Sequence, residues 1–128
     1  MSLAVAAIGM SGIISGYVVA ARRAEWSSCS AAAQAMAMER LEQTRAAKWD
    51  PDAFPSVDEL VSSNFPVVVQ PLDIPVVGTN TVLATTTTSI ASVSVAPPVR
   101  MVRISCVCSL KARGPFTNSM ISYRSPDQ

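Results

Sequence analysis

The side chains best suited to chemistry in this sequence are three cysteines, Cys29, Cys106 and Cys108. Cys106 and Cys108 stand two apart in a segment that we expect to be a strand, so both point to the same face. A disulfide between such close neighbours would be strained, and no cysteine spacing matches a zinc site. We therefore interpret all three as small apolar packing residues, because free cysteine is commonly buried.

A second group that could do chemistry is an acidic cluster of Asp50, Asp52, Asp58 and Glu59. Carboxylates of this kind can bind calcium, but their spacing is not that of an EF-hand loop. Solvated loop charge is the better interpretation. We predict no metal and no cofactor.

The remaining inventory argues against an enzyme. The chain has no histidine, which removes the commonest general base and the commonest metal ligand. It has no phosphate loop, and the run Gly12–Gly16 (GIISG) belongs to an apolar helix rather than to a nucleophile elbow. The net charge is +1 with scattered Lys and Arg, so nucleic acid is not an expected partner, and neither is a small-molecule substrate.

The element that organises the chain is its uncharged start, residues 3–21, LAVAAIGMSGIISGYVVAA. As a helix, this stretch would cover nearly the whole hydrocarbon core of a bilayer, about 30 Å. Gly12 and Gly16 have the G-x-x-x-G spacing that lets another helix approach closely, although glycine is also simply common in membrane helices. Tyr17 suits a membrane interface. The candidate membrane and assembly residues are Leu3, Val5, Ile8, Gly12, Ile13, Ile14, Gly16, Tyr17 and Val18.

No turn signal follows this stretch, and the first proline is Pro51. We therefore predict one helix of about 45 residues, roughly 70 Å long at helical rise. Its second half is amphipathic, and we expect Leu41 at the edge of the face that packs on a sheet, with Thr44 on the opposite side. The residues predicted for that face are Ala24, Ala31, Ala35, Met38 and Trp49.

After the helix the pattern changes twice. Asp50–Pro51 ends the helix, and Ser56–Glu59 fits a capping box, which predicts a short helix to about Ser63. From Phe65 onward, β-branched residues favour short strands. The predicted strands lie at Val67–Val69, Val76–Val77 and within Thr79–Val95, with a turn at Gly78–Asn80 and an exposed run at Thr85–Thr88.

The clearest β-signal is a hairpin near the C-terminus. Val99–Leu110 alternates, with Val102, Ile104, Cys106 and Cys108 on one face, and Phe116–Tyr123 returns beside it. The predicted fold is α+β, a long helix packed on a small antiparallel sheet. Its parts are residues 1–21 (membrane and assembly), 22–49 (amphipathic helix), 50–66 (connection) and 67–128 (β-domain).

This layout resembles type IV pilin-like proteins, the minor pilins and the pseudopilins of type II secretion. The matching residues are 2–51, SLAVAAIGMSGIISGYVVAARRAEWSSCSAAAQAMAMERLEQTRAAKWDP. The family carries a basic leader ending in glycine and then a Phe-Thr-Leu-(Ile/Val)-Glu run, and this sequence has neither. Ser2–Val5 looks like the part that would follow the family's acidic residue.

The resemblance implies a structural subunit of a type IV pilus or secretion filament. It would be held in the bacterial inner membrane as a single-pass protein, with its C-terminal domain in the periplasm or the filament. Its partners would be membrane lipid and other pilin or pseudopilin subunits, through the N-terminal helix. Arg22 and Arg23 alone would favour the opposite orientation by the positive-inside rule, but in the family the leader supplies the cytoplasmic basic charge.

Two other interpretations stay open. One is an anchored or secreted β-domain that acts as a binding or adhesion module, with the helix as a plain anchor. The other is a secretory signal peptide ending at Ala21, although its apolar region is long and no basic segment precedes it.

Overall fold

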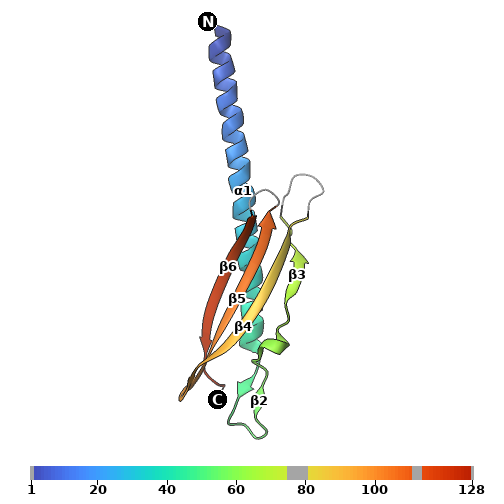
Figure 1. Ribbon diagram of the computed structural model, residues 1–128, viewed down its shortest axis with the longest axis vertical. Coiled ribbons are helices and arrows are strands. Elements are labelled where there is room, and N and C mark those ends of the chain that lie inside the picture. The colour runs from blue at the N-terminus through green and yellow to red at the C-terminus, as the bar shows by residue number, and fades with distance from the viewer. Residues whose placement is uncertain (1, 75–80, 111–113, 128) are drawn as a thin grey trace.

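The computed structural model describes residues 2–74, 81–110 and 114–127, with side chains from residue 8 onward. Its first element is the helix α1, Ser2–Ala46, which runs without a break for 45 residues. The predicted single helix is therefore confirmed, and it does not bend away at Arg22. Figure 1 shows the N-terminal half of α1 standing clear of the rest of the chain, and the C-terminal half lying behind the sheet.

The strands form two antiparallel sheets. The short strands β1 (Trp49–Asp50) and β2 (Val57–Asp58) pair with each other. The larger sheet has four strands in the sequential order β3 (Val68–Pro71), β4 (Leu83–Val95), β5 (Pro98–Leu110) and β6 (Gly114–Arg124). The α+β class is therefore correct, and the sheet is larger than the small one predicted.

In the C-terminal hairpin, strand β5 buries the face that the sequence predicts. Val102, Ile104, Cys106 and Cys108 of β5 are all buried, whereas Arg103 between them is exposed. Strand β6 pairs along β5 from Leu110↔Gly114 to Arg100↔Arg124. Gly114 has a φ of 78°, a left-handed conformation that costs glycine little.

The helix face that packs on the sheet differs from the predicted one. The buried helix residues are Cys29, Ala33, Ala37, Leu41 and Thr44, whereas Ala24, Ala31, Ala35 and Met38 are exposed. The buried set follows spacings of three and four residues, as one helix face must. The prediction placed Met38 on the packed face and Thr44 on the opposite side. In the structure the Thr44 hydroxyl donates to the Leu41 carbonyl oxygen at 2.7 Å, so its burial leaves no unpaired donor.

The connection after the helix contains no capping box. Val57–Asp58 is strand β2, and the helical residues nearby are a single 3₁₀ turn, η1, at Ser62–Asn64. The Asp58 carboxylate binds Arg100, and the Glu59 carboxylate accepts from the Lys48 backbone N–H instead of capping a local helix. Tertiary contacts therefore override the local capping signal.

The threonine run Thr85–Thr88 is not a uniformly exposed stretch. Thr86 is buried and Thr87 is exposed, because successive residues of β4 point to opposite faces of the sheet. The strand predicted at Val76–Val77 and the turn predicted at Gly78–Asn80 lie outside the described residues.

The core lies between the C-terminal half of α1 and the inner face of the larger sheet. Its buried side chains are Cys29, Ala33, Ala37, Leu41, Trp49, Leu60, Phe65, Leu72, Val82, Ala84, Val102, Ile104, Cys106 and Cys108. The molecule exposes 8649 Å² in total. A compact monomer of the same mass would expose about 6,500 Å². The excess reflects the bare half of the helix, which gives the molecule its rod shape (Figure 1).

Candidate functional site

The N-terminal half of α1, called the bare half below, is the candidate functional surface because its side chains are exposed. Every described side chain from residue 8 to residue 24 is exposed. Of the predicted assembly residues, Ile8, Ile13, Ile14 and Tyr17 are each more than 60% exposed, and Val18 is 42% exposed. The side chains of Leu3 and Val5 lie outside the description. The structure thus brings the described members of the predicted set onto one exposed helical segment, where they do not pack against any other described part of the chain.

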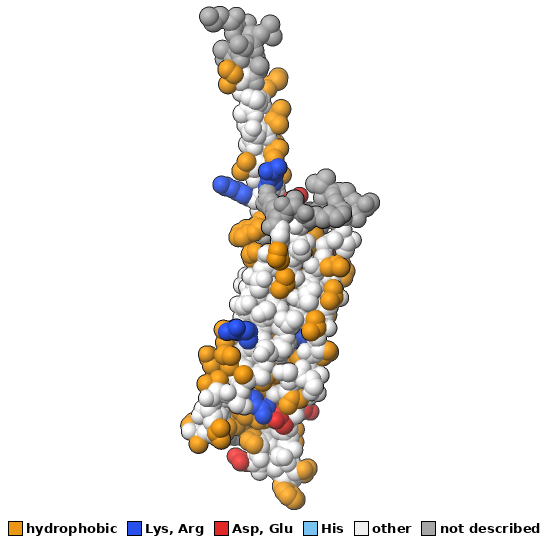
Figure 2. All heavy atoms as spheres, in the orientation of Figure 1, with side chains coloured by type: hydrophobic (Ala, Val, Ile, Leu, Met, Phe, Trp, Pro, Cys, Tyr) orange, Lys and Arg blue, Asp and Glu red, His pale blue; other side chains and the backbone are white. Residues whose placement is uncertain are grey.

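The apolar residues surround this segment rather than forming a stripe. At 100° per residue, Ile14 and Val18 share one side of the helix, whereas Ile8 and Ile13 lie on two other sides. Helices that are apolar all round are normally buried in a membrane or inside a protein. Figure 2 shows hydrophobic side chains along both visible edges of this segment.

Gly9, Gly12 and Gly16 share one side of the bare segment, within about 60° of each other at helical periodicity. A Cβ atom added to any of them would meet nothing within 4 Å. Glycine costs about 1 kcal/mol relative to alanine inside a helix. No contact within the described chain explains that cost, so the three glycines provide a smooth surface that a partner can approach.

Within the described residues, no helix is both long enough and apolar enough to cross a bilayer.

The bare segment ends at an aromatic pair. Trp26 of α1 and Phe116 of β6 contact each other edge to face, with ring centroids 5.3 Å apart. Trp26 is 50% exposed, and a shallow hollow beside it is lined by Leu110, Pro115 and Phe116. Arg22 and Arg23 lie one turn closer to the N-terminus on the same helix.

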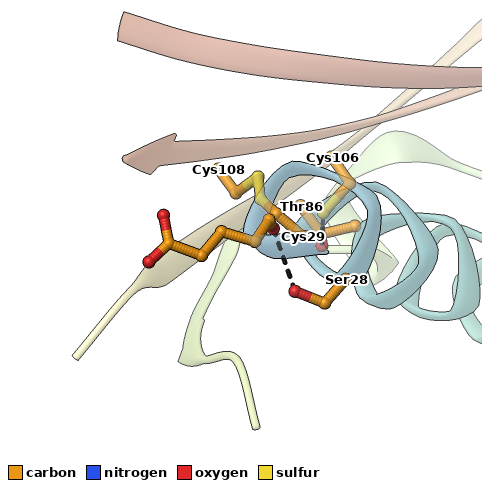
Figure 3. The surroundings of a disulfide bond; sticks show 6 residues. Ser28, Cys29, Thr86, Cys106 and Cys108 are labelled. Carbon is orange, nitrogen blue, oxygen red and sulfur yellow. Dashed lines mark hydrogen bonds between the residues drawn. A yellow bond between two sulfur atoms is a disulfide. The ribbon is translucent and has the colours of Figure 1, made fainter. Parts of the chain in front are cut away.

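Immediately beyond this pair, a disulfide joins the helix to the sheet. Cys29 of α1 is bonded to Cys108 of β5, and 79 positions separate the two residues in the sequence. Figure 3 shows this bond between helix and strand, with Cys106 beside it. The hydroxyl of Ser28, the residue before Cys29 in the helix, donates a hydrogen bond to the Glu25 carbonyl oxygen. Cys106 has a buried free thiol, and its sulfur accepts a hydrogen bond from the Thr86 hydroxyl at 3.6 Å. The packing interpretation therefore holds for Cys106 and is wrong for the other two cysteines.

At the far end of the molecule, Arg100 of β5 holds the connecting segment in place. Its guanidinium donates to both carboxylate oxygens of Asp58 at 2.6 and 2.7 Å and to the Leu60 carbonyl at 2.8 Å. It also lies 4.4 Å from the centre of the Trp49 ring. The hydrogen bond from Arg100 lowers the pKa of Asp58, and the same contact raises the pKa of Arg100.

The C-terminal tail is tied to the end of the helix. Arg124 donates to the carbonyl oxygens of Thr44 and Ala47 at 2.7 and 2.8 Å, which pairs two of the free carbonyls at the helix end. Its second nitrogen binds Asp127 at 2.6 Å. The Trp49 backbone N–H also donates to Asp127, and this bond, followed by Arg124, lowers the pKa of that carboxyl.

The acidic cluster does not gather into a metal site. Among the described residues, no group of three or more His, Cys, Asp or Glu side chains could hold a metal ion. Asp58 and Glu59 instead accept hydrogen bonds from Arg100 and the Lys48 N–H.

Comparison with known proteins found no match: the chain matches no protein-family model, no curated protein and no solved structure.

Sequence reasoning missed two features at the base of the bare helix. The first is the Cys29–Cys108 bond, which requires knowing that the Cys29 face of the helix meets β5. The second is the Trp26–Phe116 contact, for which the only available signal was an aromatic residue shortly after Arg22 and Arg23.

Proposed function

We propose that this chain is a pilin-like structural subunit of a type IV pilus or a type II secretion-like filament. In this proposal, the N-terminal helix holds the subunit in the bacterial inner membrane before assembly. The observation that carries the proposal is the division of one unbroken helix. The side chains of residues 8–21 are all exposed, whereas the part from Cys29 to Thr44 is packed on the sheet and covalently bonded to it.

Hydrophobic energetics favour two apolar environments for the bare half. Full exposure of an aliphatic side chain such as Ile13 or Ile14 costs about 2 kcal/mol relative to burial. Lipid and the helices of sister subunits both keep these side chains away from water. Exchange of lipid for protein contacts therefore needs little hydrophobic free energy.

The glycines favour assembly over a plain anchor. An anchor that needs only lipid contacts would lose nothing if Gly9, Gly12 and Gly16 were alanine, because none of them has a close neighbour within the chain. Helix–helix association in membranes, by contrast, uses small residues to bring two backbones together. This is the reason for preferring a filament subunit to the alternative, a membrane-anchored binding module.

The disulfide supports an oxidising compartment for the folded domain. Cys29 lies six positions after Arg23, so the boundary of the bare helix is close to the bond. Disulfides persist in the bacterial periplasm and are rare in the cytosol. The bond therefore supports a periplasmic or extracellular position for the domain in this proposal, as in the pilin-like orientation and unlike the orientation that Arg22 and Arg23 alone would favour.

The proposal is tested by placing a charge on the bare helix. Ile13→Arg in the full chain should abolish carbonate-resistant membrane association and incorporation into sheared filaments, because an arginine at the centre of an apolar helix opposes burial in both environments. The matched control is Thr117→Arg, which adds the same charge on the exposed outer face of β6. Normal membrane association and normal incorporation of Ile13→Arg would contradict the proposal.

A further inference from the structure

The aromatic pair at the base of the bare helix lies at a defined height along the rod. Trp26 is five residues beyond Ala21, the end of the apolar run, which corresponds to about 7 Å of helix rise. The headgroup layer of a bilayer extends about 5–7 Å beyond the hydrocarbon core on each side. If residues 3–21 fill the core, then Trp26 and the Phe116 ring in contact with it lie at headgroup level.

The chemistry at this height matches a lipid headgroup layer. Trp26 is half exposed, and tryptophan is enriched at membrane interfaces because its ring is amphipathic. Phe116, Leu110 and Pro115 extend the apolar surface from the end of the β-sheet. Arg22 and Arg23 add positive charge one turn closer to the hydrocarbon. Figure 2 shows Lys and Arg side chains where the bare helix meets the β-domain, with hydrophobic side chains on the domain side of them.

We infer that Trp26, together with Phe116, Leu110 and Pro115, is a membrane-interface anchor that seats the β-domain on anionic phospholipid headgroups. This inference rests on the membrane-held state of the proposed function and adds a second contact to it. The disulfide at Cys29, three residues beyond Trp26, fixes the helix to the sheet just above the anchor. The height of the whole domain above the bilayer is then set by the depth of Trp26.

The experiment uses the two tryptophans of the full chain. Trp49 is buried and lies beyond the far end of the helix, at least about 30 Å of helix rise from Trp26. The protein is reconstituted into vesicles of phosphatidylethanolamine and phosphatidylglycerol, with or without a lipid that carries a nitroxide quencher on its headgroup. We expect the nitroxide to remove most of the Trp26 emission and none of the Trp49 emission.

The matched variant is Trp26→Phe, which keeps an aromatic ring against Phe116. It should bind vesicles and retain Trp49 emission, and the nitroxide should no longer quench it. In vesicles of phosphatidylcholine alone, quenching of the wild type should decrease, because the positive charge of Arg23 then meets no net negative charge.

Co-flotation with the vesicles separates this inference from the proposed function. A protein that floats with vesicles but whose Trp26 is not quenched would overturn the anchor and leave the membrane-held subunit intact. Trp26 emission that shifts only in assembled filaments would assign the patch to a neighbouring copy and likewise overturn the lipid assignment. Failure to float would overturn both proposals.

Discussion

Two cysteines decide how the helix and the sheet are joined at the residue level. Cys29 is bonded to Cys108, and Cys106 lies two residues away with its side chain on the same buried face of β5. A crosslink that closes a loop of this length restricts the unfolded chain strongly, which is one accepted source of disulfide stabilisation. The bond also lies at the boundary between the bare and packed halves of the helix, where bending of the rod would otherwise begin.

We predict that reduction of this bond lowers the free energy of unfolding by about 2–5 kcal/mol, the usual cost of removing a native disulfide from a small domain. Urea unfolding of the full chain in a non-ionic detergent, with and without reductant, measures the change. The Cys108→Ala variant should be insensitive to reductant.

The control for that prediction is Cys106→Ala, which removes the neighbouring buried thiol. This variant should keep the full response to reductant. Loss of the response in Cys106→Ala, with retention in Cys108→Ala, would mean that Cys29 pairs with Cys106 instead. The variants are needed because both cysteines of β5 fall in one tryptic peptide, residues 104–111.

At the level of elements, the segment between helix and sheet contains only the short β1–β2 pair and one 3₁₀ turn, and charged groups add most of its contacts to the rest of the chain. Arg100 of β5 binds Asp58 of β2 through two hydrogen bonds and lies against the Trp49 ring. Asp127 accepts from the Trp49 N–H and from Arg124, which in turn binds the carbonyls at the end of α1. These contacts connect β1, β2, β5 and the tail to the end of the helix.

Acid should loosen this end of the molecule. Hydrogen bonds lower the folded-state pKa of Asp58 and Asp127 below the value of an unfolded aspartate, about 3.9. A carboxyl with a lowered folded pKa stabilises the fold above its unfolded pKa, and this stability is lost as the pH falls through the folded value. The thermal unfolding midpoint should therefore be level near pH 6 and should fall below about pH 4.

The Asp58→Asn variant tests the source of that pH dependence. It should unfold at a lower temperature than the wild type near neutral pH, and its midpoint should fall less between pH 5 and pH 2. Glu42→Gln is the control, because Glu42 binds Arg45 in an exposed pair, which typically adds little to stability. If the unfolding midpoint of Asp58→Asn falls between pH 5 and pH 2 as steeply as that of the wild type, the Asp58–Arg100 pair is not a source of the pH dependence.

The elements with strong periodicity could be predicted from the sequence, and those set by tertiary contacts could not. Unbroken helix formers before Pro51 predict the 45-residue helix, and the alternation of Val99–Leu110 predicts β5 with the correct buried residues. The predicted inner face of α1 was wrong because alanines lie on all sides of the helix, so local composition does not distinguish Ala33 and Ala37 from Ala31 and Ala35. Contact with the sheet decides which alanines are buried.

The candidate site divides in the same way. The apolar start identifies the bare segment because it lacks both charge and proline, whereas the other long uncharged stretch, residues 74–99, contains prolines at its ends and a run of threonines. The Trp26–Phe116 contact and the Cys29–Cys108 bond each join residues at least 79 positions apart, so sequence spacing gives no sign of them. The predicted short helix at Ser56–Ser63 failed because the acidic side chains of the capping pattern bind Lys48 and Arg100.

On the scale of the whole molecule, one helix has an exposed half and a packed half. Its second half forms the core of a water-compatible domain with the inner face of the four-stranded sheet. Its first half presents apolar side chains and three glycines to whatever surrounds it. Because the disulfide and Arg124 fix the packed half at both ends, forces on the bare half are transmitted directly to the domain. This rigid connection is what a subunit extracted from a membrane into a filament requires.

The most direct test of this account is a photo-crosslinker at position 13 of the full chain, produced in its native host. Benzoylphenylalanine in place of Ile13 should give phospholipid adducts in the membrane fraction and, in the filament fraction, adducts to a second copy through the same half of the helix. The same probe at Thr117, on the outer face of the sheet, should give no lipid adduct. Adducts from position 13 to the β-domain of its own chain, or to neither lipid nor a second copy, would contradict the account.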